Sequence, residues 1–138
     1  MKKNADAVII GGGVMGCSIL YNLAVRGVTN TILVEKDVLC AGSTGRSSGI
    51  VRMHYSSEVN ARLALKSLDI IKNFSEIVGG DSGFVNAGVM FIVPLNSMKS
   101  FSKNITMQQS LGIKTRIIDC AEAREIAPNI EVSECEGI

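Results

Sequence analysis

Tryptophan is absent from this sequence of 138 residues, histidine occurs once, and proline occurs twice. No apolar run approaches the roughly 20 residues that a bilayer-spanning helix needs, so we do not expect an integral membrane protein. The formal net charge is +1, and the lysines and arginines are scattered, so no basic surface is predicted for nucleic acid. These absences favour a soluble, cytoplasmic protein.

The four cysteines, Cys17, Cys40, Cys120 and Cys135, form no CxxC pair and have no histidine cluster beside them. This pattern argues against a metal site and against a disulfide framework, so we expect no metal and reduced thiols. The length is that of one ordinary domain with enough apolar residues for a core, and a second complete domain is not expected.

A glycine motif lies near the start of the chain, where residues 5–37 predict a strand, a turn, a helix, a second strand and an acid. The apolar run Ala7–Ile10 predicts a central parallel strand that is buried on both faces. Gly11, Gly13 and Gly16 follow at GxGxxG spacing. The first two allow a tight turn and the close approach of a pyrophosphate, and the third allows the helix to pack against the strand.

The helix is predicted from about Val14 to Arg26, and its N-terminal N–H groups and positive dipole end are suited to phosphate oxygens. Thr31–Val34 is predicted to be the second strand. Glu35 follows it, nineteen residues after Gly16, where a carboxylate can accept hydrogen bonds from both hydroxyls of a ribose. The order of elements predicts a dinucleotide-binding unit, and a βαβ unit without a nucleotide is the alternative.

Residues 36–48 form a polar loop at a point where a nicotinamide-binding unit would pass directly into another helix. Gly42 and Gly45 expose backbone N–H groups, Arg46 adds a cation, and several serine and threonine hydroxyls lie between them. This set is suited to a long ligand that bears phosphate groups. A solvated loop with no ligand is the alternative.

The remainder of the chain predicts helices over 57–78, 97–111 and 119–127, the last with capping-box spacing between Asp119 and Glu122. β-prone runs predict a hairpin over 84–93 and a strand over 115–118. Only two strands are assigned to the first sheet, and residues 131–138 add no further one. We therefore expect that the fold is incomplete within these 138 residues.

The chain resembles the amino-terminal part of the D-amino-acid oxidase superfamily in the segments GGGVMGCSILYNLAVRG, VEKD and AGSTGRSSGIVRMHY. It is most similar to the branch of sarcosine oxidase β subunits, dimethylglycine dehydrogenases and FAD-dependent proline dehydrogenases. The resemblance covers nearly all of this chain but only the first part of a typical member. It implies an α/β fold: a partial Rossmann-type FAD/NAD(P)-binding domain over 1–78, and the beginning of an α+β substrate domain over 79–138.

The resemblance also implies which residues hold FAD, and non-covalent binding is expected. The residues implied for the pyrophosphate and ribose are Gly11, Gly13, Val14, Met15, Gly16, Glu35 and Lys36. Those implied for the second FAD-contacting loop are Gly42, Ser43, Thr44, Arg46, Ser47, Ser48 and Gly49.

Two further residues follow that loop. Arg52 matches an arginine that in some sarcosine-oxidising relatives binds the substrate carboxylate, a role that suits a planar bidentate cation. The alternative for Arg52 is a structural ion pair. His54 lies near a segment where some relatives attach flavin covalently, but its spacing does not match that pattern, and a packing or hydrogen-bonding role is favoured.

The resemblance implies an FAD-dependent oxidoreductase that oxidises the C–N bond of an amino acid or N-methyl amino acid by hydride transfer to flavin. A partner subunit or a missing carboxy-terminal half is expected to supply further substrate-binding groups. Two alternatives stay open. One is an NAD-linked Rossmann dehydrogenase, and the other is a nucleotide-binding piece that is not catalytically competent alone.

Overall fold

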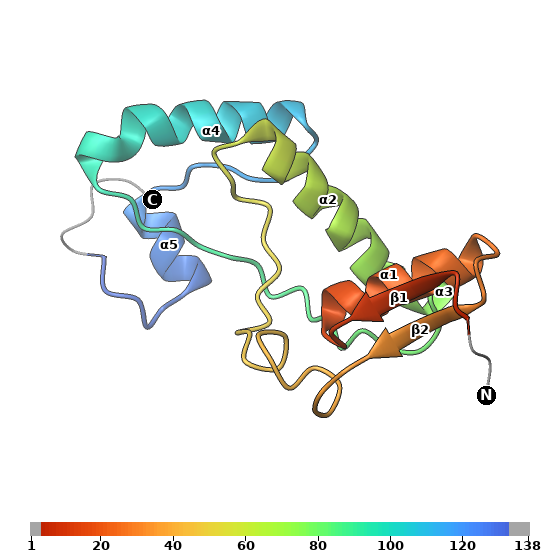
Figure 1. Cartoon of the computed structure of the whole chain (residues 1–138). Coiled ribbons are helices and arrows are strands. Elements are labelled where there is room, and N and C mark those ends of the chain that lie inside the picture. The colour runs from red at the N-terminus through yellow and green to blue at the C-terminus, as the bar shows by residue number, and fades with distance from the viewer. Residues whose placement is uncertain (1–3, 133–138) are drawn as a thin grey trace. The chain divides into compact units, whose positions relative to one another are not determined.

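The structure, a computed structural model, describes residues 4–132 of the chain (Figure 1). The chain separates into two compact units, of which the first ends at Ile50 and the second begins at Val51. Residues 133–138, for which no strand was expected, lie outside the described part, and so does Cys135. Among residues 4–132, no helix is both long and apolar enough to cross a membrane.

The first unit is the predicted strand, helix and strand. β1 (Ala7–Ile10) and β2 (Thr31–Val34) pair in parallel, with Ala7 opposite Thr31. α1 (Val14–Val25) connects them and packs on both strands (Figure 1). Gly27, at φ +86°, follows the end of α1, in the left-handed conformation that glycine adopts without strain. The predicted elements of this unit are therefore confirmed.

The prediction that β1 is buried on both faces is wrong. Ile9 is buried, whereas Val8 is 58% exposed and Ile10 is 88% exposed. The physical reason is that the described elements of this unit include a single helix, and one helix covers a single face of two paired strands. The continuous apolar run of β1 therefore leaves one apolar face open to solvent.

The predicted helix over 57–78 is present but interrupted. α2 (Glu58–Lys72) and α3 (Phe74–Ile77) are separated at Asn73. The Asn73 side-chain amide donates to the Asp69 carbonyl oxygen at 3.0 Å, where the backbone N–H of Asn73 also donates at 3.1 Å. Such a side chain competes for the carbonyl groups that a helix would use, which favours an interruption at this residue.

The second unit continues with η1 (Leu95–Ser97), α4 (Met98–Ser110) and α5 (Cys120–Ile126), close to the bounds that were predicted. The predicted cap of α5 is confirmed, because Asp119 Oδ1 accepts the Glu122 backbone N–H at 2.8 Å. The Glu122 carboxylate itself pairs with Arg116. Ala123 and Val132 form the buried centre of this region.

The predicted hairpin over 84–93 and strand over 115–118 are wrong, since β1 and β2 are the two strands of the described residues. Gly88 does turn the chain at φ +80°, but no ladder forms on either side of it. An isolated two-stranded hairpin is marginal in water without a packed apolar face. Val85 is 80% exposed and Val89 is 52% exposed, so this hairpin would have no such face.

The compact units divide after Ile50, because α2 packs against α4 of the second unit. A boundary between an FAD domain and a substrate domain after residue 78 stays a prediction.

Candidate functional site

The glycine turn joins β1 to α1. Gly11 has φ +103°, and its N–H donates to the Val34 carbonyl oxygen at 2.8 Å, so the pairing of the two strands continues into the turn. A Cβ on Gly16 would lie far inside 3.0 Å of the Gly11 carbonyl oxygen, closer than side chains approach backbone. The spacing of these glycines therefore reflects a real close approach between helix and strand.

The N-terminus of α1 has one N–H group, that of Val14, bonded to Thr44, and its own N-cap residue provides no side-chain cap. Gly13 occupies the N-cap position and has no side chain to cap the helix, and the first turn carries no acid. The N–H groups of the first residues of a helix have no partner within it, and they carry the positive end of the helix dipole. Val14 and Met15, at 60% and 73% exposure, leave this end accessible. These features fit the pyrophosphate of a dinucleotide.

Glu35 is bound to the glycine turn through its carboxylate. Oε2 accepts the Gly12 N–H at 2.7 Å, and Oε1 accepts the N–H groups of Lys36 and Asp37 at 2.8 and 3.1 Å. These bonds, that from Gly12 first, lower the pKa of Glu35 below its ordinary value. Each carboxylate oxygen has two lone pairs, so Glu35 can hold the turn and still accept from a ribose hydroxyl.

The polar loop folds back onto the same turn. Thr44 Oγ1 accepts the Val14 N–H at 3.0 Å, and the Cys40 N–H donates to the Gly12 carbonyl oxygen at 3.0 Å. Cys40 has φ +65°, the single non-glycine residue with positive φ in the described chain, and its backbone carbonyl accepts the Gly45 N–H at 2.9 Å. The structure thus brings Thr44 to the N-terminus of α1, where the predicted phosphate-binding residues lie.

Other predicted residues of the loop are not brought to the turn. Ser43, Arg46 and Ser48 are exposed, and within residues 4–50 they make no hydrogen bond to it. The Ser47 hydroxyl accepts the Gly49 N–H at 3.2 Å, which shapes the loop itself. A role in FAD binding stays a prediction for these residues. The same applies to Gly42 and to the exposed side chain of Lys36.

The roles of two residues were missed in the sequence analysis: Gly12 in the turn and Cys40 in the loop that folds onto it. Gly12 was read only as the variable position of GxGxxG, yet it donates to Glu35 and accepts from Cys40. A Cβ on Gly12 would meet Leu39 Cδ2 at 2.5 Å, so the middle glycine of the GGG run was the available signal in the sequence. Cys40 carried no signal, because nothing in the sequence indicates its positive φ.

The second unit carries Arg52 in an irregular segment at its start. Arg52 is exposed, and its guanidinium carbon lies 5.7 Å from the ring centres of both Tyr55 and Phe91. The ion pairs between described residues are Arg62 with Glu58 and Arg116 with Glu122. No acid among the described residues therefore pairs with Arg52, as the alternative of a structural ion pair would require. The planar guanidinium of Arg52 is available to a carboxylate ligand.

His54 is packed between aromatic rings and bonded to α4. Its ring centre lies 4.5 Å from that of Phe91 and 4.9 Å from that of Phe101. Its Nδ1 lies 3.1 Å from Gln108 Oε1. The favoured packing and hydrogen-bonding role of His54 agrees with these contacts.

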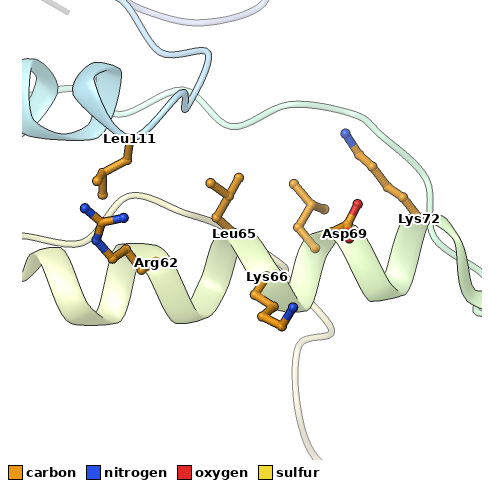
Figure 2. Close-up of a pocket in the computed structure, with 7 residues that line it drawn as sticks. Arg62, Leu65, Lys66, Asp69, Lys72 and Leu111 are labelled. Carbon is orange, nitrogen blue, oxygen red and sulfur yellow. The ribbon is translucent and has the colours of Figure 1, made fainter.

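A shallow groove on the second unit lies apart from these residues. It follows α2 and includes Leu111 at the end of α4, whose side chain points toward α2 (Figure 2). Its rim carries both signs of charge, including Arg62, Lys66 and Asp69. The groove includes neither Arg52 nor any residue of the glycine turn, so it does not extend the candidate site.

Comparison with known proteins identifies the family to which this chain belongs. Residues 6–137 match the model of the DAO family, described as FAD dependent oxidoreductase, and the chain belongs to this family. The FAD assignment is thereby confirmed, and an NAD-linked dehydrogenase is set aside.

Individual relatives are consistent with that membership. The chain is 26% identical over 139 residues to the mitochondrial sarcosine dehydrogenase of Mus musculus, covering 99% of this chain and 15% of that protein. It is 24% identical to sarcosine oxidase subunit beta of Rhodobacter capsulatus, covering 96% and 32%. The crystal structure of L-proline dehydrogenase from P.horikoshii matches with a TM-score of 0.80 and 28% identity, covering 99% and 36%. The chain thus spans a minor part of each relative, and the partial Rossmann-type fold is confirmed.

Proposed function

We propose that this chain serves in the oxidation of the C–N bond of an amino acid or N-methyl amino acid. The observation that carries the proposal is Arg52, an exposed guanidinium that has the aromatic rings of Tyr55 and Phe91 beside it and no ion pair with an acid of residues 4–132. Such a group receives a carboxylate in bidentate geometry. The names of the relatives support this class of substrate, because they include sarcosine and L-proline.

The proposed cofactor site is the glycine turn of the first unit. The N-terminus of α1 would receive the pyrophosphate, Glu35 would accept from the ribose, and Thr44 would adjoin the phosphates. FAD, bound non-covalently, would supply the acceptor for the hydride that leaves the carbon atom of the C–N bond. The residues of the chain orient the cofactor and hold the substrate carboxylate.

Further groups of the substrate site are proposed to come from additional chain or from a partner subunit. Two observations support this proposal: the open face of β1, with Ile10 at 88% exposure, and the name of the relative sarcosine oxidase subunit beta. The alternative function is a nucleotide-binding piece that performs no oxidation by itself.

The test of the proposed function begins with the visible spectrum of the purified chain after incubation with FAD and gel filtration. Flavin bands that remain with the protein are the expected result. The flavin-loaded chain is then mixed with sarcosine, dimethylglycine or L-proline, with and without the rest of a sarcosine-oxidising relative, and bleaching of the flavin is followed. Retained flavin that no amino acid bleaches in either mixture would favour the alternative.

The variants Arg52→Ala and Arg52→Lys distinguish the proposed substrate site from the proposed cofactor site. Because Arg52 lies outside the glycine turn, both variants are expected to retain flavin as the wild type does. Replacement by alanine removes the bidentate partner of the carboxylate and is expected to raise the KM for the amino acid by about tenfold to a hundredfold, in line with about 1.5–3 kcal/mol for a charged hydrogen bond. Loss of flavin in Arg52→Ala would instead assign Arg52 to the cofactor.

A further inference from the structure

The side chain of Gln108 fixes the orientation of its own amide. Gln108 is fully buried on α4, and its Nε2 lies 3.0 Å from the carbonyl oxygen of Tyr55. A carbonyl oxygen can only accept a hydrogen bond, so the amide atom facing Tyr55 must be the nitrogen. The other amide atom, which lies 3.1 Å from His54 Nδ1, is therefore the oxygen.

That orientation decides the tautomer of His54. An amide oxygen has no proton to donate, so Nδ1 of the imidazole must carry the hydrogen of this bond. In the neutral ring the proton is then absent from Nε2, which keeps a lone pair and acts as an acceptor. Within residues 4–132, Nε2 has no hydrogen-bond partner. Gln108 therefore presents His54 as a hydrogen-bond acceptor to whatever approaches Nε2.

His54 and Arg52 share one aromatic neighbour. The His54 ring lies 4.5 Å from the ring of Phe91, and the Arg52 guanidinium carbon lies 5.7 Å from the same ring. Both residues belong to the short segment whose end is bonded to Gln108 through Tyr55. A cationic donor and a hydrogen-bond acceptor thus both lie next to Phe91, and together they complement a molecule that carries a carboxylate and an amine.

We propose that His54 is a substrate-binding residue whose Nε2 accepts a hydrogen bond from the amine nitrogen of the amino acid, and that Gln108 is the residue that positions it. The inference rests on the proposed function, in which Arg52 receives the carboxylate. It adds a second point of recognition, because a carboxylic acid without an amine would satisfy Arg52 and leave Nε2 without a donor.

The tautomer is measurable because His54 is the only histidine of the sequence. In long-range ¹H–¹⁵N spectra of the ¹⁵N-labelled chain above pH 8, Nδ1 is expected at the shift of a protonated nitrogen and Nε2 at that of an unprotonated one. Gln108→Leu removes the acceptor and is expected to shift the equilibrium toward the Nε2–H tautomer. Gln108→Glu retains an acceptor and is expected to keep Nδ1–H. An Nε2–H tautomer in the wild type would overturn the inference, whatever the variants do.

Gln109→Leu is the matched control. Gln109 is the neighbour of Gln108 on α4, and its side chain donates to the Thr115 carbonyl oxygen at 2.8 Å, away from the imidazole. Its loss removes a side-chain hydrogen bond from the same helix, yet the tautomer is expected to be unchanged. A tautomer change in Gln109→Leu as large as that in Gln108→Leu would assign the effect to general loosening of α4.

The recognition step is tested with sarcosine and L-proline, each compared with an acid of similar shape that lacks the amine, such as cyclopentanecarboxylate. In the flavin-loaded chain, the two amino acids are expected to shift the Nε2 resonance, and the acid is expected to shift only the Arg52 side-chain signal. His54→Phe is expected to weaken binding of sarcosine by up to about tenfold, the worth of one hydrogen bond, while leaving binding of the acid unchanged.

The outcomes distinguish the two proposals. If Arg52 responds to the amino acids and Nε2 does not, the role of His54 fails and the proposed function stands. If neither responds, both fail. A mass increase of one flavin on the peptide that contains His54 would also overturn the inference, because Nε2 would then be the point of covalent attachment.

Discussion

Replacing Gly16 by alanine is expected to separate helix α1 from strand β1. The added Cβ would lie about 1 Å inside the 3.0 Å limit that real Cβ atoms respect, and the obstacle is the backbone carbonyl of Gly11, which no rotamer change can remove. The helix must therefore retreat by about 1 Å or more, or the turn must reorganise, since protein interiors are close-packed. Either movement displaces the N–H groups that are proposed to hold the pyrophosphate.

The expected change in the free energy of unfolding of Gly16→Ala follows from two opposing effects. Alanine favours a helix over glycine by about 1 kcal/mol. Overpacking costs about 1–3 kcal/mol, and a clash with backbone belongs at the upper end. The expected net loss is about 2 kcal/mol in the free energy of unfolding, together with a loss of FAD affinity of at least about tenfold, because hydrogen bonds weaken steeply when displaced.

The assay compares urea unfolding, followed by far-UV circular dichroism, with FAD binding, followed by quenching of flavin fluorescence. Gly42→Ala is the matched control: Gly42 has no atom within 4 Å of an added Cβ and no positive φ, so it is expected to change stability by less than about 0.5 kcal/mol. If Gly16→Ala matched Gly42→Ala in stability and the wild type in FAD affinity, the close approach of helix and strand would be refuted.

Three further predictions follow from individual contacts. Thr44→Val keeps the shape of the side chain but removes the oxygen that accepts the Val14 N–H, so urea unfolding is expected to show a loss of about 1 kcal/mol, whereas Thr106→Val on exposed α4 surface is expected to show less. Because the native pKa of Glu35 is lowered, its bonds stabilise the fold above the unfolded pKa, and this stabilisation is lost as the pH falls through the native pKa. The acid-dependent loss of stability is expected to shrink in Glu35→Gln, and an unchanged pH profile would contradict this. Asp119→Ala removes the acceptor for the Glu122 N–H and is expected to lower stability by about 1 kcal/mol, while Asp119→Asn, which keeps a capping oxygen, is expected to restore most of it in the same denaturation assay.

The open face of β1 shows where sequence reasoning fails and why. A continuous apolar run is typical of a strand with cover on both sides, but a run of residues says nothing about which elements are present to cover it. Val8 and Ile10 therefore satisfy the pattern and are nevertheless exposed. The β-prone residues around Gly88 fail for a related reason, because a hairpin needs a packed face as well as a suitable turn.

Sequence patterns alone were enough to predict the order of β1, α1 and β2, the glycine turn between them, the acid after β2 and the cap of α5. These features depend on local spacing, on backbone freedom at glycine and on side chains that bond within a few residues, all of which can be read along the chain. Three contacts were visible only in the folded chain: the bond of Glu35 to Gly12, that of Thr44 to the start of α1, and that of Gln108 to His54. Those contacts join residues that are 23, 30 and 54 positions apart in the sequence. Residues so far apart are brought together by tertiary packing, which local propensity does not predict.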